Sequence, residues 1–127
     1  MDLPETLKYT ESHEWIADNV DVTVTVGITA VAAEQLGDLV YVELPKVGTS
    51  LARRANCAVV ESTKAAAEVY APVAGEVVAA NAELSDHPER VNESPYGTGW
   101  LFKLRLSDAA ELDGLLERDD YAKSAGV

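Results

Sequence analysis

The sequence predicts a mainly β fold, a flattened sandwich of antiparallel strands with short helices and a C-terminal helix. Short stretches rich in β-branched and aromatic residues recur at close spacing, and turn-forming residues separate them. Helical patterns are confined to one short stretch and to the C-terminus. With 127 residues the chain has the length of one domain, which buries a core without disulfides.

The first elements predicted are a hairpin and a short helix. Strands are expected at 14–18 ("EWIAD") and 22–27 ("VTVTVG"), with Asn19 and Asp21 in the turn between them. A helix is expected over 30–36 ("AVAAEQL"). Thr29 suits its N-cap, and Gly37 stands where a left-handed helix-ending residue is wanted.

The middle of the chain reads as strands joined by tight turns. A strand is predicted over 38–44, where Pro45 ends it because proline cannot donate to a sheet. A turn around Gly48 follows. Further strands are expected at 57–62 ("CAVVES"), 65–71 ("AAAEVYA") and 76–81 ("EVVAAN").

The last third combines a loop, a strand and the C-terminal helix. Residues 82–99 are rich in Asn, Asp, Ser, Pro and Gly, which predicts a structured loop with one helical turn. The stretch 100–106 ("WLFKLRL") alternates as a strand. Ser107 is the expected N-cap of a helix over about 107–124, with a break allowed near Gly114 or Arg118.

The charge balance restricts the possible partners. The chain has 22 acidic and 10 basic residues, a net charge of −12. Because nucleic acids and anionic membranes are bound mainly by Lys and Arg, neither is an expected partner. The partners are expected to be proteins.

Other residues exclude several kinds of site. Cys57 is the single cysteine and lies in an apolar run, so a buried structural thiol is expected rather than a catalytic one. His13 and His87 are expected to be structural, and no metal-ligand spacing is present. Without a signal-like start or a long apolar run, the chain is expected to be cytoplasmic.

Lys64 is the feature that points to a function. It is the only Lys or Arg between Asn56 and Glu89, and it lies at the tip of the predicted hairpin, in "STKA". An exposed lysine is normally a solubilising charge. The small residues around it leave the amine accessible, however, and acylation would remove its charge without disturbing the core.

Four blocks of sequence carry a family resemblance. They are "KYTESHEW", "VGITAVAAEQLGDLVYVELPKVG", "VVESTKAAAEVYAPVAGEVVAAN" and "VNESPYGTGWLFKLRLSD". With the closing helix they resemble the glycine cleavage system H-protein family of lipoyl carriers, from Lys8 to about Lys123. The lysine motif alone is shared with the lipoyl domains of 2-oxoacid dehydrogenases and, loosely, with biotin carriers. The other blocks single out the glycine system.

The resemblance implies a fold and an attachment site. The fold is a lipoyl/biotinyl-type barrel-sandwich hybrid in a single lipoyl-carrier domain, 1–127. Its parts are an opening hairpin and short helix (8–37), a core (about 22–106) and the C-terminal helix. Lys64 matches the lipoylated lysine, and its context is Glu61, Ser62, Thr63 and Ala65, with Thr63 in place of the family's valine. The lipoyl-lysine arm would reach about 14 Å when extended.

The resemblance also implies a role in glycine catabolism and one-carbon metabolism. A non-catalytic, monomeric carrier would take methylamine from the pyridoxal-phosphate enzyme glycine decarboxylase to a tetrahydrofolate-dependent aminomethyltransferase. Dihydrolipoyl dehydrogenase would then reoxidise the arm, and a lipoate-attaching enzyme would install it. One alternative is a carrier that relays lipoate to 2-oxoacid dehydrogenase complexes. Another is an enzyme that uses Lys64 as a Schiff-base nucleophile, which requires a desolvated amine.

The family is expected to hold its loaded arm in a cleft beside the tip. The candidate cleft residues are Ser12, Glu14 and Glu68, since a carboxylate accepts a charge-assisted hydrogen bond from a cationic amine. For each acid the alternative is a plain surface charge. Where some relatives have a histidine near the short helix, this chain has Gln35.

Overall fold

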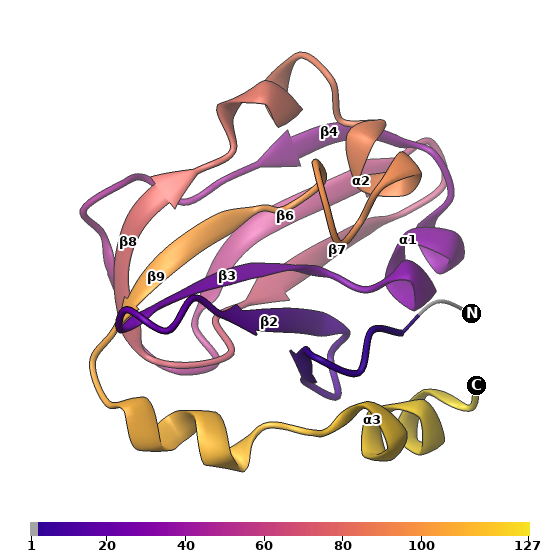
Figure 1. The fold of residues 1–127 in the computed structure, drawn as a ribbon. Helices are drawn as coiled ribbons and strands as arrows, with labels where there is room; N and C mark the ends of the chain where they lie inside the picture. Colours follow the sequence, from indigo (N-terminus) through magenta and orange to yellow (C-terminus); the bar gives the residue numbers. More distant parts are fainter. Residues whose placement is uncertain (1–2) are drawn as a thin grey trace.

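The computed structural model describes residues 3–127, which form two antiparallel sheets with short helices at their edges (Figure 1). The first two residues of the predicted domain lie outside the described part. The larger sheet has the order β1 (Lys8–Tyr9), β2 (Glu14–Asp18), β3 (Thr23–Ile28), β9 (Phe102–Leu106), β8 (Gly75–Ala80) and β5 (Ser50–Leu51). The smaller has the order β4 (Leu39–Glu43), β6 (Asn56–Ser62) and β7 (Ala66–Tyr70). The predicted mainly β sandwich is confirmed.

The main core contains apolar side chains from strands of both sheets. Alternate positions face inward because successive side chains of a strand point to opposite faces. Its most buried strand residues are Ile16, Val24, Val26, Val60, Val69, Val77, Phe102 and Leu104. Full burial of such a side chain stabilises the fold by about 1.5–3 kcal/mol. This core fixes the position of the β6–β7 hairpin, which projects Lys64.

The helix α1 (Ala30–Leu36) has the predicted limits and the predicted caps. The Thr29 hydroxyl accepts a hydrogen bond from the Ala32 N–H at 3.3 Å. At the other end, the Gly37 N–H donates to the Ala33 carbonyl at 3.1 Å. Gly37 has φ 82° and ψ −166°, a backbone conformation essentially reserved for glycine, so its φ is positive as expected but its ψ is extended.

The prediction of one continuous C-terminal helix is wrong, and the break allowed near Gly114 or Arg118 is confirmed. The segment forms a 3-10 helix η2 (Ala109–Gly114), an extended stretch and the helix α3 (Arg118–Ala125). Asp108, not Ser107, is the first cap, because its carboxylate accepts from the Ala110 N–H at 3.0 Å. Leu116 is extended because its backbone pairs with Tyr9, at 2.8 and 2.9 Å.

This C-terminal segment packs on the first strands of the chain, as Figure 1 shows in yellow and indigo. The rings of Tyr121 and Tyr9 stack with their centroids 4.8 Å apart. With Leu3, Trp15 and Val31 they form a second, smaller core.

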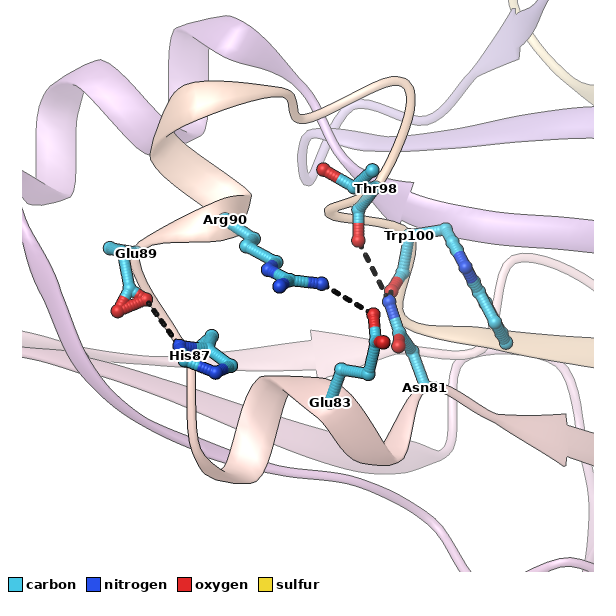
Figure 2. Close-up of polar contacts among 7 residues, drawn as sticks. All are labelled: Asn81, Glu83, His87, Glu89, Arg90, Thr98 and Trp100. Carbon is cyan, nitrogen blue, oxygen red and sulfur yellow. Dashed lines mark hydrogen bonds and ion pairs between the residues drawn. The ribbon is translucent and has the colours of Figure 1, made fainter.

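Three other elements differ from the prediction. The strands β1 and β5 have only two residues each and carry no strand pattern of their own, because pairing with Trp15 and with Gly75 defines them. The loop 82–99 contains two helical pieces, η1 (Ala82–Ser85) and α2 (Arg90–Glu93), where one turn was expected. Figure 2 shows how Asn81 closes this loop: its Nδ2 donates to the carbonyls of Thr98 and Trp100, at 2.9 and 2.8 Å.

Candidate functional site

Lys64 lies at the tip of the β6–β7 hairpin, in the turn Ser62–Ala65. The Ser62 N–H donates to the Ala65 carbonyl at 2.8 Å. The Ser62 hydroxyl accepts from the N–H groups of Ala65 and Lys64, at 3.1 and 3.3 Å. Neither Thr63 nor Lys64 has positive φ, which fits a type I turn with serine in its first position. The tip is therefore an unstrained turn held by its own serine.

The side chains at this tip are open to solvent. Thr63, Lys64 and Ala65 are exposed, and Glu61 and Ser62 are half-buried. Lys64 forms no ion pair with any residue of 3–127. A Schiff-base nucleophile needs an amine that is withdrawn from water, and the exposed Lys64 is not.

The three predicted cleft residues meet at one cavity of about 130 Å³, called here the small cavity. Ser12 and Glu14 come from the first hairpin, and Glu68 comes from β7. Apolar side chains from β3, α1 and the β6–β7 hairpin complete the wall. The full lining is Ser12, His13, Glu14, Ile28, Ala32, Gln35, Leu36, Val60, Ala67, Glu68 and Val69.

Glu14 is a buried carboxylate rather than a plain surface charge, with only 1% of its surface exposed. Its Oε1 accepts hydrogen bonds from the hydroxyls of Thr10 and Ser12, both at 2.6 Å, and its Oε2 accepts from the Tyr70 N–H at 3.5 Å. Burial raises the pKa of Glu14, and these hydrogen bonds oppose the rise. The charge of Arg54 also opposes the rise, so the cavity holds a preorganised acceptor that already interacts with one cation.

Glu68 and Gln35 complete the polar part of the small cavity. Glu68 is exposed, and its carboxylate accepts a hydrogen bond from the Tyr70 hydroxyl at 3.1 Å. Gln35 lines the wall from α1. The acidic side chains that line this cavity are Glu14 and Glu68, so the cavity suits a cationic ligand.

Sequence reasoning missed a second cavity of about 500 Å³, called here the large cavity. It shares Ser12 and Glu14 with the small cavity and adds Arg53 and Arg54, both exposed. Arg54 has φ 70°, and its N–H donates to the Ala71 carbonyl at 2.8 Å. The only signal in the sequence is two adjacent arginines in a strongly acidic chain.

Each histidine lies next to a polar side chain, and His13 also lines the small cavity. The His13 Nδ1 is 2.6 Å from the Tyr121 hydroxyl, and the Thr29 hydroxyl is 2.8 Å from the same oxygen. Burial lowers the pKa of His13, so it is neutral at physiological pH. His87 faces Glu89 at 3.7 Å in the loop of Figure 2. Both are structural residues in this fold.

Cys57 is half-buried and is a thiol rather than a thiolate. Its Sγ donates to the Val69 carbonyl at 3.3 Å. Burial, and secondarily the charge of Glu14, raises the pKa of Cys57 to about 12. Such a sulfur is a poor nucleophile.

The described residues include neither a metal-binding cluster nor a membrane-spanning helix. Among residues 3–127, no group of three or more His, Cys, Asp or Glu side chains is placed to hold a metal ion. No helix in that range has the length and apolar character needed to cross a membrane.

Comparisons with known proteins agree on one family. The family model described as Glycine cleavage H-protein matches residues 7–126. A glycine cleavage system H protein of Chromobacterium violaceum is 55% identical over 125 residues, covering 98% of both chains. One of Nitrosomonas eutropha is 57% identical over 123 residues, covering 97% of this chain and 95% of the relative. The crystal structure of a glycine cleavage system H protein from Mycobacterium marinum superposes with a TM-score of 0.89 at 39% identity, covering 98% of this chain and 100% of that one.

Proposed function

The chain belongs to the glycine cleavage H-protein family, and from this premise we propose that Lys64 is the residue to which lipoate is attached. The protein is a lipoyl carrier of the glycine cleavage system. The names of its relatives do not favour the alternative of a lipoate relay to 2-oxoacid dehydrogenases. The proposal concerns which residues of this chain bear the lipoyl arm and hold the methylamine group.

The position of Lys64 is the observation that carries the proposal. Its amine is exposed at the tip of a rigid turn, where the active site of a lipoate-attaching enzyme can enclose it. Ser62 holds the turn, and Ala65 adds little bulk beside the amine. Thr63 is exposed, so its difference from the family's valine costs no packing.

The reach of the arm favours the small cavity over the large one. Ala67 and Glu68 follow Lys64 by three and four residues, which is about 10–13 Å along a strand. Tyr70 and Pro72, which line the large cavity, follow by six and eight residues, or about 20–26 Å. An arm of about 14 Å matches the first distance and not the second.

The residues of the small cavity fit a carried methylamine group. When bound, lipoate supplies a disulfide that takes up methylamine and two electrons. The Glu14 carboxylate, held by Thr10 and Ser12, accepts a charge-assisted hydrogen bond from a cationic amine. Glu68 adds negative charge at the rim. The apolar wall limits the access of water.

Charge and shape suit transient docking on several enzymes. The proposed partners are glycine decarboxylase, aminomethyltransferase, dihydrolipoyl dehydrogenase and the lipoate-attaching enzyme. The net charge of −12 speeds association with basic surfaces, and this effect weakens with salt. In this proposal the chain acts as a monomer in the cytoplasm and catalyses no step itself.

Mass spectrometry tests the attachment site. After incubation with lipoate, ATP and a lipoate-attaching enzyme, the intact mass should rise by one lipoyl group, and peptide mapping should place it on Lys64. The Lys64→Arg variant should stay unmodified, whereas Lys46→Arg, at another exposed lysine, should be modified normally. Because Lys64 is exposed, its loss should change the unfolding free energy by no more than about 0.5 kcal/mol. Modification of Lys64→Arg would refute the proposal.

A further inference from the structure

We infer that Gly37 is a positioning residue for Lys64: the missing side chain at Gly37 makes a notch in which the lysine stem lies beside the small cavity. This inference rests on the proposed role of Lys64 as the attachment site. Gly37 directly follows α1, far in sequence from the hairpin that bears Lys64. The sequence motif around the lysine does not identify Gly37.

The close approach of the two residues is the first observation. A Cβ built on Gly37 would lie 3.4 Å from Cε of Lys64 and 3.9 Å from its Nζ. These are the last atoms of the lysine stem, where the arm begins once the amine is acylated. A methyl group at position 37 would lie in ordinary van der Waals contact with Cε, whereas a longer side chain would extend into the space around Cε and the amine.

The notch has a rigid base, because the side chain of Asn92 braces both sides of it. The Asn92 Nδ2 donates to the Gly37 carbonyl at 2.9 Å, and its Oδ1 accepts from the Leu39 N–H at 2.9 Å. The Gly37 N–H is already bonded to Ala33. Since the backbone at Gly37 is held from both directions, a side chain there would displace the lysine rather than the backbone.

The pairing of β4 with β6 places the backbone near Gly37 beside the turn that bears Lys64. Leu39, two residues after Gly37, pairs with Ser62, the serine that holds the turn of Lys64. The contact between Lys64 and Gly37 is thus built into the smaller sheet.

The notch lies between two stretches that line the small cavity. Gln35 and Leu36 directly precede Gly37, and Ala67 and Glu68 closely follow Lys64. When the Lys64 side chain lies in the notch, the lipoyl arm begins beside the residues that line the small cavity. The lysine side chain also loses rotamer freedom before the arm enters the cavity, which lowers the entropic cost of entry.

The first experiment uses NMR on the unmodified protein and needs no lipoate. Wild type should show a nuclear Overhauser cross-peak between the Gly37 Hα and the Lys64 Hε protons. Gly37→Leu should abolish contact of the Lys64 Hε protons with the backbone of residue 37, whereas Gly37→Ala should keep it, because a methyl group there makes only ordinary contact with Cε. Both variants place a side chain at the same positive φ and so have similar backbone strain. A difference between their cross-peaks therefore reports crowding of the Lys64 side chain. The absence of the wild-type cross-peak would overturn the inference even if neither variant folds.

Gly48 offers a matched control for the strain. It also has positive φ, 94°, but a Cβ there would meet no atom within 4 Å. Gly48→Leu should therefore be destabilised by a similar backbone effect and yet keep the contact between Gly37 and Lys64. Loss of that contact in Gly48→Leu would show that general strain, not the notch, controls the lysine.

The second experiment measures how long the lipoylated protein keeps its methylamine group. Loss to water breaks the carbon–sulfur bond, consumes one water molecule, releases formaldehyde and ammonia, and leaves a thiol on the arm. The rate follows the fraction of arms outside the cavity, so Gly37→Leu should lose the group roughly three to ten times faster than wild type. Gly48→Leu should match wild type.

The outcomes separate this inference from the proposed function. If wild type is not lipoylated at Lys64, the proposed function fails, and the cross-peak still reports the contact. If wild type is lipoylated and Gly37→Leu keeps its methylamine group as long as Gly48→Leu does, only the role of Gly37 fails.

Discussion

The small and large cavities share Ser12 and Glu14 but differ in size, charge and distance from Lys64. The large cavity has about four times the volume, 500 against 130 Å³, and a larger pocket is the usual first choice for a ligand site. Nevertheless, Ala67 and Glu68 of the small cavity follow Lys64 within about the length of a lipoyl arm. Tyr70 and Pro72 of the large cavity follow farther along the chain. In a carrier, the position of a cavity relative to the tether is more informative than its volume.

The charges that line the two cavities also favour the small cavity as the site of the carried methylamine group. Glu14 and Glu68 give the small cavity negative charge, which suits a methylamine cation. The large cavity adds Arg53 and Arg54, which suit anions. Glu14 lines both cavities and therefore lies at the boundary between an acidic and a partly basic environment.

The largest expected effect comes from neutralising Glu14, with Glu11 as the matched control. Glu11 lines only the large cavity and is exposed. Glu14→Gln removes the charge from the hydrogen bond to the cationic amine, so the carried methylamine group should be lost roughly tenfold faster. Glu11→Gln should have no effect. The measurement is the decay of the methylamine adduct by intact mass.

An equal effect of the two glutamate variants would contradict the assignment of the arm to the small cavity. Fast loss in Glu11→Gln alone would move the carried group to the large cavity. Lipoylation should be complete in both variants, because neither glutamate lies at the tip, and this can be checked before the decay is measured.

A smaller effect is expected from filling each cavity in turn. Ala67→Leu adds bulk at the wall of the small cavity, whereas Gly114→Leu adds it at the large cavity, where a Cβ meets nothing within 4 Å. Ala67→Leu should shorten the lifetime of the carried methylamine group by roughly threefold, as arms are excluded from the cavity. Gly114→Leu should not change it. The opposite ranking would favour the large cavity.

The parts of the fold that depend on neighbouring residues could be predicted from the sequence. The limits of the helix Ala30–Leu36 and its caps Thr29 and Gly37 depend on nearby residues and are confirmed, although the left-handed conformation predicted for Gly37 is wrong, since its ψ is −166°. The hairpin strands show clear alternation. In contrast, β1 and the extended Leu116 exist because they pair with each other across more than a hundred residues, and nothing in their local sequence signals it.

The site likewise contains residues that the sequence could indicate and residues that only contacts in the folded chain reveal. The isolation of Lys64 on a predicted tip drew attention to it, but its role as the attachment site, like the choice of Ser12, Glu14 and Glu68, followed from the family resemblance. Gly37 and Asn92 were not predicted as site residues, because a helix-ending glycine and a loop asparagine have common structural explanations. Only their contacts with Lys64 and with the backbone before β4 connect them to the site.

Glu14 should also give the stability a measurable pH dependence. Burial raises the pKa of Glu14 above its ordinary value of 4.5, so the folded chain holds this proton more tightly than the unfolded chain does. The stability that this proton provides is full below pH 4.5 and is lost as the pH rises through the raised pKa. The unfolding free energy of wild type minus that of Glu14→Gln should therefore fall as the pH rises from 4.5.

Urea unfolding of both proteins across this range provides the measurement. The lowered pKa of His13 has the opposite effect, since it makes stability rise with pH below 6.5. That contribution is common to wild type and Glu14→Gln and largely cancels in the difference. A difference that is flat or rises with pH would mean that Thr10 and Ser12 stabilise the ionised carboxylate enough to overcome its burial.

The smallest functional effect is expected at Cys57, which lines neither cavity and therefore serves as a reference for both. With a pKa of about 12 against an ordinary 9.0, the folded thiol should have roughly a thousandfold less thiolate than the unfolded chain at pH 8. Iodoacetamide should accordingly label Cys57 far more slowly in native protein than in urea. Cys57→Ala should carry methylamine with wild-type lifetime. Rapid labelling of the native protein would show that β6 opens beside the cavities, and the rigid wall assumed for both would have to be abandoned.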